Sequence, residues 1–209
     1  MPESAKAGPI QPLLCGILSG GMSRRMGQSK DSIVLPDGRM MAERVIDAML
    51  SISNEIVIAG PELPLVVKEN ERLHYVKDNY PGSGPLSGIE AILASGRAKA
   101  YLIAACDQPF LNPELMKRLI PKDKEMPSFF DFTANGYIQP FPGYYPLSWL
   151  PEIRDSLRRN RRAIKSLIAD SDVALQEIDE ESALCLQSIN TPEELSKLLQ
   201  DLSGAKSLY

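Results

Sequence analysis

The chain has 209 residues, of which 44% are hydrophobic and 24% are charged, and its formal net charge is -4. These values are typical of a globular protein with a sizeable core, and the acidic balance disfavours general nucleic-acid binding. The cysteines Cys15, Cys106 and Cys185 are odd in number and widely spaced, which disfavours a disulfide framework and a zinc site. No apolar run reaches the ~20 residues of a membrane span, so we expect a cytoplasmic protein that binds no membrane.

Apolar runs and amphipathic segments alternate along the first part of the chain. We expect strands at residues 13–19, 55–59, 73–76 and 100–105, and helices at residues 40–50 and 85–96. Strand and helix in turn predict an α/β fold, a three-layer α/β/α arrangement with a mostly parallel sheet. We expect one domain over residues 1–209, with residues 1–12 as a loose tail.

Two further helices carry start signals. Asn112 and Pro113 are the N-cap and first-position residues of one helix, whose apolar face extends to Ile120. After residue 125 the pattern loosens into aromatic residues and prolines. Thr191 and Glu194 then form a capping box before a last amphipathic helix, which we expect to pack back on the domain.

The first predicted strand ends in a segment rich in glycine and positive charge, LSGGMSRRMGQSK (residues 18–30). Gly20 and Gly21 can take positive φ, and their exposed backbone N–H groups can form a nest for an anion. Arg25 and Lys30 add full positive charges. The segment has neither the GK[ST] end of a Walker A loop nor a GxGxxG fingerprint. We interpret it as a cradle for a polyphosphate, with a solvated basic turn as the alternative.

Two more segments carry polar groups to the same predicted edge of the sheet. Asp107 directly follows the strand at 100–105, and with phosphates nearby its natural partner is Mg²⁺. The loop DNYPGSGPLSG, at residues 78–88, can hold a base or ribose by backbone groups, with Asp78 accepting a hydrogen bond. The alternatives are a capping aspartate at the first position and an ordinary turn at the second.

Four segments together resemble the MobA-like nucleotidyltransferases. They are LSGGMSRRMGQSK, DNYPGSGPLSGIEAIL, ACDQPFLNPEL and INTPEEL, and they occur in the family's order over residues 13–195. The resemblance implies a Rossmann-like nucleotidyltransferase fold. It also implies an enzyme that transfers GMP from GTP to Mo-molybdopterin, forming Mo-molybdopterin guanine dinucleotide and pyrophosphate. Other molybdenum cofactor biosynthesis proteins or apo-molybdoenzymes are the further partners that it implies.

The resemblance also assigns roles to single residues. It implies nucleotide contacts from Leu18, Ser19, Gly20, Gly21, Lys30, Asp78, Gly84, Pro85, Leu86 and Asp107. It implies that Arg25, Lys30 and Asp107 are catalytic, the two cations on phosphates and Asp107 on Mg²⁺. Asn190 is expected near the metal or the second substrate.

Other functions stay open because the chain departs from the family pattern. Ser19, Ser29, Ala59 and Ser188 replace residues usual in the family, and a non-catalytic nucleotide-binding or scaffold protein would tolerate such changes. The DQP after Cys106 is similar to related cytidylyltransferases, so CTP as donor, or a sugar phosphate as acceptor, is the enzymatic alternative. The segments GPLSG and INTP favour the guanine enzyme.

Three further features allow two interpretations each. The arginine-rich run at residues 154–165 is a solvated face or a surface that attracts an anionic substrate or an acidic partner. The aromatic segment is core packing or a wall against the pterin, and it contains Tyr137, Phe141, Tyr144, Tyr145 and Trp149. His74 is expected to lie at a strand edge rather than to take part in catalysis or metal binding.

Overall fold

The computed structural model describes residues 11–20, 33–61, 70–132 and 137–204. The strands of this part are β1 (Leu14–Leu18), β2 (Ile56–Ala59), β3 (Leu73–Val76), β4 (Ala100–Ala105), β5 (Ser128–Phe132), β6 (Tyr137–Pro146) and β7 (Ala174–Glu177). They form one sheet in the order β3-β2-β1-β4-β6-β5-β7. Within the described ranges, β6 alone runs antiparallel to its neighbours, β4 and β5. The predicted mostly parallel sheet is confirmed.

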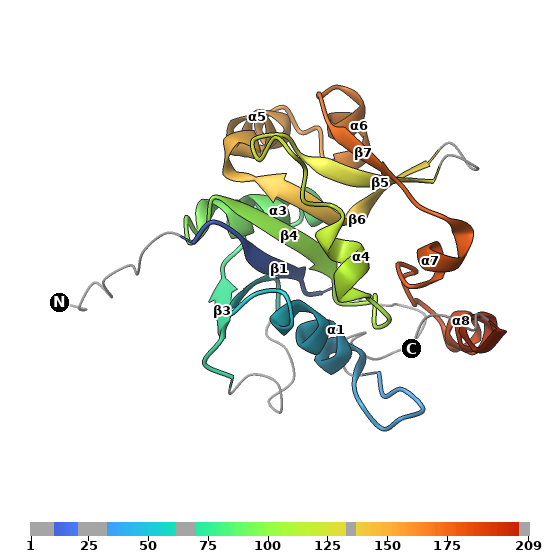
Figure 1. The fold of residues 1–209 in the computed structure, drawn as a ribbon. Helices are drawn as coiled ribbons and strands as arrows, with labels where there is room; N and C mark the ends of the chain where they lie inside the picture. The colour runs from blue at the N-terminus through green and yellow to red at the C-terminus, as the bar shows by residue number, and fades with distance from the viewer. Residues whose placement is uncertain (1–10, 21–32, 62–69, 133–136, 205–209) are drawn as a thin grey trace.

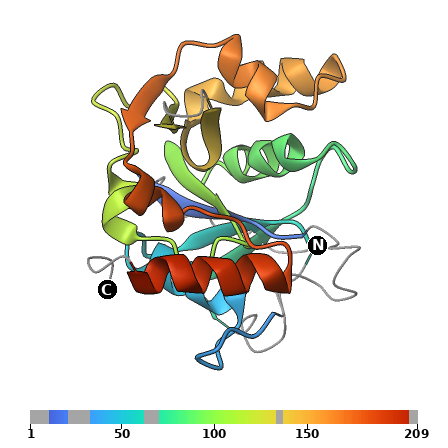
Figure 2. The same cartoon turned by 90° about the vertical axis from the view of Figure 1, so that its right-hand side faces the viewer.

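Helices cover both faces of the sheet (Figure 1). They are α1 (Met41–Leu50), α3 (Pro85–Ala94), α4 (Pro113–Lys117), the 3₁₀ turn η3 (Leu147–Trp149), α5 (Leu150–Arg158), α6 (Ile164–Ala169), α7 (Glu180–Leu184) and α8 (Pro192–Gly204). Figure 2 shows α3, α5 and α6 above the strands and α1 and α8 below them. The three-layer α/β/α prediction is therefore confirmed. None of the helices in the described ranges is long and apolar enough to cross a membrane.

Side chains alternate between the two faces of the sheet because successive Cβ atoms point in opposite directions. In β1, Cys15 and Ile17 pack with α1, whereas Leu14 and Leu18 pack with α3. Both faces of the strand are buried, which explains its continuous apolar sequence. On α1, Val45 and Met49 are fully buried, and each such side chain contributes roughly 1.5–3 kcal/mol to stability.

Most of the expected boundaries agree with the structure, with three corrections. Gln11 is not part of a loose tail, because its N–H donates to the carbonyl of Arg97 over 2.8 Å and its carbonyl accepts from the N–H of Lys99 over 2.9 Å. The helix at Asn112 ends at Lys117 rather than at Ile120. Strands β5, β6 and β7 were not expected.

The capping signals are confirmed at one helix and partly at the other. Asn112 Oδ1 accepts from two N–H groups of the first turn of α4, at 2.9 and 3.1 Å. Thr191 Oγ1 accepts from the N–H of Glu194 over 3.1 Å, as a capping box requires. The Glu194 carboxylate, however, accepts from the N–H of Asn190 and not from that of Thr191.

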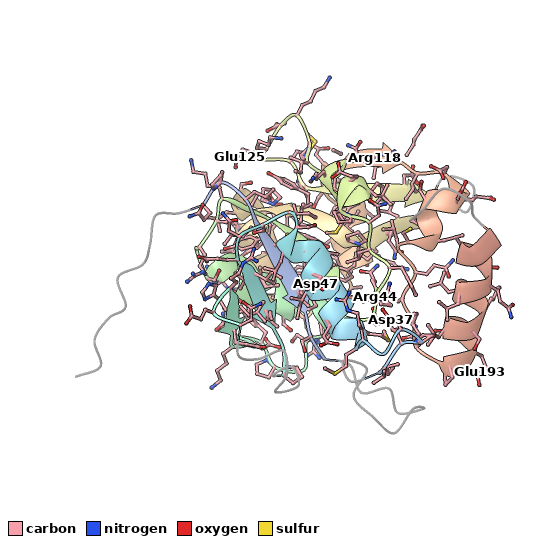
Figure 3. All side chains as sticks on the ribbon, turned by 60° about the horizontal axis from the view of Figure 1, so that its bottom comes forward. Asp37, Arg44, Asp47, Arg118, Glu125 and Glu193 are labelled. Atoms are coloured by element: carbon pink, nitrogen blue, oxygen red, sulfur yellow. The ribbon has the colours of Figure 1, made fainter. Side chains whose placement is uncertain are left out.

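The loop before α1 is held to that helix by ion pairs. Arg44 Nη2 lies 2.7 Å from Asp37 Oδ2, and Figure 3 shows the two side chains next to each other at one end of α1. The hydrogen bond from Arg44 lowers the pKa of Asp37 below its usual value. Arg39 of the same loop pairs with Asp47. These contacts fix the loop at residues 37–39 against α1, a few residues after the predicted phosphate cradle.

Candidate nucleotide site

The sheet contains a topological switch point at the carboxyl ends of β1 and β4. The chain places β2 and β3 on one side of β1 and then crosses to place β4 on the other side. Leu18 lies opposite Ala105, and the N–H of Cys106 donates to the carbonyl of Leu18 over 3.1 Å. Ligands of open α/β sheets bind in the crevice at such a point. Gly20 and Asp107 therefore emerge at the same edge, as the sequence predicts.

A cavity of about 450 Å³ opens at this edge. It is lined by Leu18, Ser19, Gly20, Ala59, Gly60, Asp78, Gly84, Pro85, Ser87, Gly88, Ala105, Cys106, Asp107, Phe141 and Ser188. The ends of β1, β2 and β4, the start of α3 and parts of two later segments thus meet around one space. The size and the mixed lining are typical of a small-molecule site.

Ser19 and Gly60 bring the ends of β1 and β2 into close contact. Gly60 has a φ of +126°, and a Cβ there would lie 1.9 Å from the carbonyl oxygen of Ser19, so no other residue fits. The Ser19 hydroxyl donates to the carbonyl of Pro61 over 3.0 Å, and its N–H donates to that of Ala59 over 2.8 Å. The serine that departs from the family pattern therefore ties two strand ends together.

The N-terminus of α3 forms another wall of the cavity. Gly84, the N-cap, has a φ of +73°, and Pro85 follows at the first helical position, where its missing N–H costs nothing. A Cβ on Gly88 would lie 2.7 Å from Leu18 Cδ2, so this glycine lets α3 approach β1 closely. The helix dipole favours an anionic ligand at this wall, whereas Pro85 has no N–H and Ser87 donates its own to the carbonyl of Gly84 over 3.2 Å.

Asp78 is oriented by two hydrogen bonds. Its Oδ1 accepts from the N–H of Tyr80 over 2.7 Å, and its Oδ2 accepts from the hydroxyl of Ser87 over 2.9 Å. Each carboxylate oxygen can accept a further bond, so Asp78 can still receive a donor from a ligand. The Asp78 side chain, which the sequence predicts to contact a nucleoside, thus lies at the cavity in a fixed orientation.

Asp107 is positioned by contacts on either side of it. Its carbonyl accepts from the N–H of Ile189 over 2.8 Å. The next residue, Gln108, is fully buried, and its Oε1 accepts from the N–H of Ala105 over 3.1 Å. Gln108 Nε2 donates to the carbonyls of Phe141 at 2.9 Å and Leu186 at 2.7 Å. The loop that carries Asp107 is therefore locked to both later segments of the cavity.

The donor set fits a magnesium ion that arrives with a nucleotide. Asp78 and Asp107 line the same cavity, whereas the described ranges contain no cluster of three or more histidine, cysteine or acidic side chains that could hold a metal by themselves. Mg²⁺ is usually bound by one or two carboxylates together with substrate phosphates and water. The site matches that kind of coordination rather than an all-protein cage.

Five of the predicted site residues are not found at the cavity. Three of them, Gly21, Arg25 and Lys30, lie outside the described residues. Leu86, the second residue of α3, is fully buried in the core, where it packs behind the wall of the cavity. Asn190 donates its N–H to Glu194 at the start of α8, and its near neighbour Ser188 lines the cavity in its place.

A bulge in β6 explains how an aromatic residue reaches the cavity. Phe129 pairs with Gly143 whereas Phe130 pairs with Gln139, so residues 140–142 stand out from the ladder. Phe141, within this bulge, lines the cavity and stacks on Tyr145, with ring centroids 6.3 Å apart. One residue of the aromatic segment thus lines the cavity, and a wall against the pterin stays a prediction.

The other members of the predicted aromatic segment whose side chains are described are core residues. Tyr144, Tyr145 and Trp149 are buried, and Tyr145 lies 5.9 Å from Trp149 between ring centroids. Burial raises the pKa of Tyr145 well above its usual value. His74 lies on β3, the edge strand, with Nε2 2.9 Å from Glu55 Oε2, which confirms its expected place.

The basic run is only partly a solvated face. Arg154 Nε donates to Glu90 Oε1 over 2.8 Å, and Arg162 Nη1 donates to the carbonyl of Gly82 over 3.1 Å. Arg159, in contrast, pairs with Asp155 on the exposed side of α5. Two arginines of the run thus contact the loop at residues 78–88 and the helix that follows it, which their local sequence did not indicate.

Comparison with known proteins agrees with this geometry. A probable molybdenum cofactor guanylyltransferase of Flavobacterium johnsoniae is 31% identical to this chain, over 93% of it and 100% of the relative. The crystal structure of the molybdopterin-guanine dinucleotide biosynthesis protein A of Archaeoglobus fulgidus superposes with a TM-score of 0.73 at 22% identity, over 93% of this chain and 100% of that one.

The fold is shared more widely. The 2-C-methyl-D-erythritol 4-phosphate cytidylyltransferase of Thermus thermophilus has a TM-score of 0.62 at 16% identity, over 88% of this chain and 96% of that one. The model of the MobA-like NTP transferase domain matches residues 15–177, which contain nearly the whole cavity. The chain belongs to the MobA-like NTP transferase domain family.

Proposed function

We propose that the protein transfers GMP from GTP to Mo-molybdopterin, with Mo-molybdopterin guanine dinucleotide and pyrophosphate as products. One observation carries the proposal: the exits of β1 and β4 are joined by a hydrogen bond, so the glycine turn and Asp107 meet in one cavity. The name of the Flavobacterium johnsoniae relative, which this chain covers completely, supports the choice of reaction.

The residues of the chain have distinct tasks in this proposal. Gly20 offers its N–H, and the N-terminus of α3 offers its helix dipole, to the triphosphate. Asp78 accepts a hydrogen bond from the nucleoside. Arg25 and Lys30 neutralise the charge that develops on the leaving pyrophosphate. No side-chain base is needed, because the attacking terminal phosphate of the pterin is already an anion near neutral pH.

Asp107 is the residue that would hold Mg²⁺. When bound, the ion supplies positive charge to phosphate oxygens whose mutual repulsion would otherwise oppose the reaction. Ile189 and Gln108 fix the loop that carries Asp107, so the backbone that bears its carboxylate is in place before substrates arrive. Preorganised charge of this kind is the main protein contribution to phosphate chemistry.

The choice of nucleotide rests on relatives and motifs rather than on the fold. A cytidylyltransferase shares the architecture, so a CTP-dependent reaction is the second candidate. The segment GPLSG forms the α3 wall of the cavity through Gly84, Pro85, Ser87 and Gly88, and this segment favours the guanine enzyme.

The test is incubation of the protein with each of the four NTPs, Mg²⁺ and Mo-molybdopterin, with pyrophosphate release measured and the dinucleotide identified by mass spectrometry. We expect release with GTP and the guanine dinucleotide as product. Release with CTP alone would establish the cytidine alternative. Nucleotide binding without pyrophosphate release would establish the non-catalytic alternative, because binding requires no bond cleavage.

We also propose a cytoplasmic location. Cys15, Cys106 and Cys185 are all free and buried, as is usual for proteins of reducing compartments. Other molybdenum cofactor biosynthesis proteins or apo-molybdoenzymes are the proposed partners, because the product must be passed on. Co-purification of the full chain with such an apoenzyme tests this part of the proposal.

A further inference from the structure

A buried carboxylate contacts the loop at residues 78–84. Glu90 of α3 is 1% exposed, although acidic side chains are rarely buried without partners. Its Oε1 accepts from Arg154 Nε of α5 over 2.8 Å, and its Oε2 accepts from Asn79 Nδ2 over 2.9 Å. Both oxygens are therefore used, one by a neighbouring helix and one by the loop.

The loop at residues 78–84, which we call the Asp78 loop, is attached at several points. Asn79 follows the cavity residue Asp78 directly, so the bond to Glu90 anchors the backbone next to that carboxylate. Further along, the carbonyl of Gly82 accepts from Arg162 Nη1 over 3.1 Å. The segment that contributes Asp78 and Gly84 to the cavity is thus held from α3 and from the basic run.

We propose that Glu90, held by Arg154, is a positioning residue that fixes the Asp78 loop through Asn79 and thereby sets the affinity for the nucleotide. The inference rests on the proposed function, which places the nucleoside at this loop. A buried carboxylate cannot move to water without breaking its pair, so it gives Asn79 an acceptor at a fixed position. A loop that is ordered before binding costs less to bind, and that gain is lost when the anchor is removed.

The effect should be confined to the nucleotide. In the proposed arrangement Asn79 anchors the part of the Asp78 loop that faces the nucleoside and not the reacting phosphates, so this anchor stabilises ground state and transition state equally. Loss of such an interaction raises KM and leaves kcat unchanged. A general loss of packing would instead lower kcat and weaken the binding of the pterin substrate as well.

The decisive variant is Asn79→Ala, because Asn79 is exposed and its side chain can be removed without opening the core. We expect the dissociation constant of GTP to rise about tenfold, the value for loss of one bond to a charged group. The kcat is expected to stay within about twofold of wild type, as uniform binding predicts. Titration calorimetry measures the affinity without the second substrate, and pyrophosphate release measures KM and kcat.

Arg154→Met tests the other side of the pair. It should weaken GTP binding at least as much and lower the unfolding temperature, because it leaves Glu90 charged and buried. Adding Glu90→Gln to Arg154→Met removes both charges and keeps an oxygen acceptor for Asn79, so it should restore most of the affinity. Arg159→Met is the matched control: this arginine lies next to α5 and pairs with exposed Asp155, at side-chain exposures of 64% and 47%.

The outcomes separate this inference from the proposed function. Unchanged GTP affinity in both Asn79→Ala and Arg154→Met would overturn the inference, as would an equal loss of affinity in Arg159→Met. A parallel loss of kcat and pterin binding would assign the pair to general stability and overturn it too. If wild type binds GTP but releases no pyrophosphate, the proposed function fails, and the calorimetric affinities still decide the inference. If wild type binds none of the four NTPs, both fail.

Discussion

The N–H of Cys106 donates to the carbonyl of Leu18 over 3.1 Å, one position beyond the last residue of β4. This bond extends the β1–β4 ladder to its outer end, so the two chain exits cannot separate without breaking it. It therefore fixes the distance between the glycine turn after β1 and Asp107. The geometry on which the proposed chemistry depends is set by main-chain pairing and not by flexible side chains.

The first prediction concerns Asp107. Asp107→Ala should lower the rate of pyrophosphate release by about a hundred- to a thousandfold, the range for loss of one group that stabilises transition-state charge, or ~2.7–4 kcal/mol. Urea unfolding should change little, because the neighbouring bonds of Ile189 and Gln108 involve groups that the substitution leaves in place. Asp155→Ala, on the exposed side of α5, is the control and should keep full activity. Near-normal turnover in Asp107→Ala would refute the metal role.

A second prediction follows from the contact between Gly60 and Ser19. Gly60→Ala should lower the free energy of unfolding by about 2–5 kcal/mol, since it adds left-handed strain to a clash with backbone. Gly38→Ala is the matched control, because Gly38 also has positive φ, at +84°, but among the described residues beyond its two chain neighbours no atom lies within 4 Å of its Cβ position. It should cost only about 1–2 kcal/mol. Equal losses in urea unfolding would show that the close approach of the two strand ends has no energetic weight.

A third prediction concerns Gln108. Gln108→Leu leaves the N–H of Ala105 and the carbonyls of Phe141 and Leu186 without their hydrogen-bond partner. Each unsatisfied buried group costs about 1–3 kcal/mol, so we expect a loss of about 3 kcal/mol or more in urea unfolding. Gln187→Leu, on the exposed residue next to Leu186, should change stability by less than about 0.5 kcal/mol. A Gln108→Leu protein as stable as wild type would contradict the role assigned to this side chain.

The fourth prediction concerns alkaline pH. Burial, with smaller contributions from Glu125 and Asp123, raises the pKa of Tyr144 to about 12 from 10.0. In the unfolded chain the phenol loses its proton near pH 10.0, whereas the folded protein keeps it. The stability that Tyr144 contributes is therefore full below pH 10.0 and is lost as pH rises toward about 12.

Urea unfolding at several pH values checks this sign. The free energy of unfolding of wild type should fall between about pH 10 and about pH 12, and Tyr144→Phe should show a shallower fall, since it removes one of the titrating groups. Absorbance of the phenolate at alkaline pH follows ionisation of the folded protein directly. A slope identical in both proteins would mean that Tyr144 ionises equally in both states.

The sequence predicted the half of the sheet that carries the switch point. β1 and β4 are buried on both faces and therefore appear as continuous apolar runs, and α3 follows a glycine and proline signal that fixes its start. Because parallel strands direct their carboxyl ends to one edge, the meeting of Gly20 and Asp107 could be predicted as well.

The other half could not be predicted, for reasons that lie in the residues. β6 contains Pro140, Pro142 and Pro146. Proline has no N–H to donate to a neighbouring strand, so prolines within a segment argue against a strand there. The structure accommodates two of them in the bulge at 140–142, where no ladder hydrogen bond is required. The bond between Arg154 and Glu90 joins residues 64 positions apart, so no local sequence pattern could predict it. Gln108 likewise contacts Leu186, 78 positions away.

The cavity takes its lining from residues as far apart in the sequence as Leu18 and Ser188. During synthesis on the ribosome, Ser19 and Gly20 therefore emerge well before the last residue of the cavity has been made. A nascent chain that has made only β1 to β4 lacks Phe141, Ser188 and the arginine behind Glu90. Competence to bind substrate therefore requires translation through Ser188, and a chain cut short by a nonsense codon after β4 is expected to be inert.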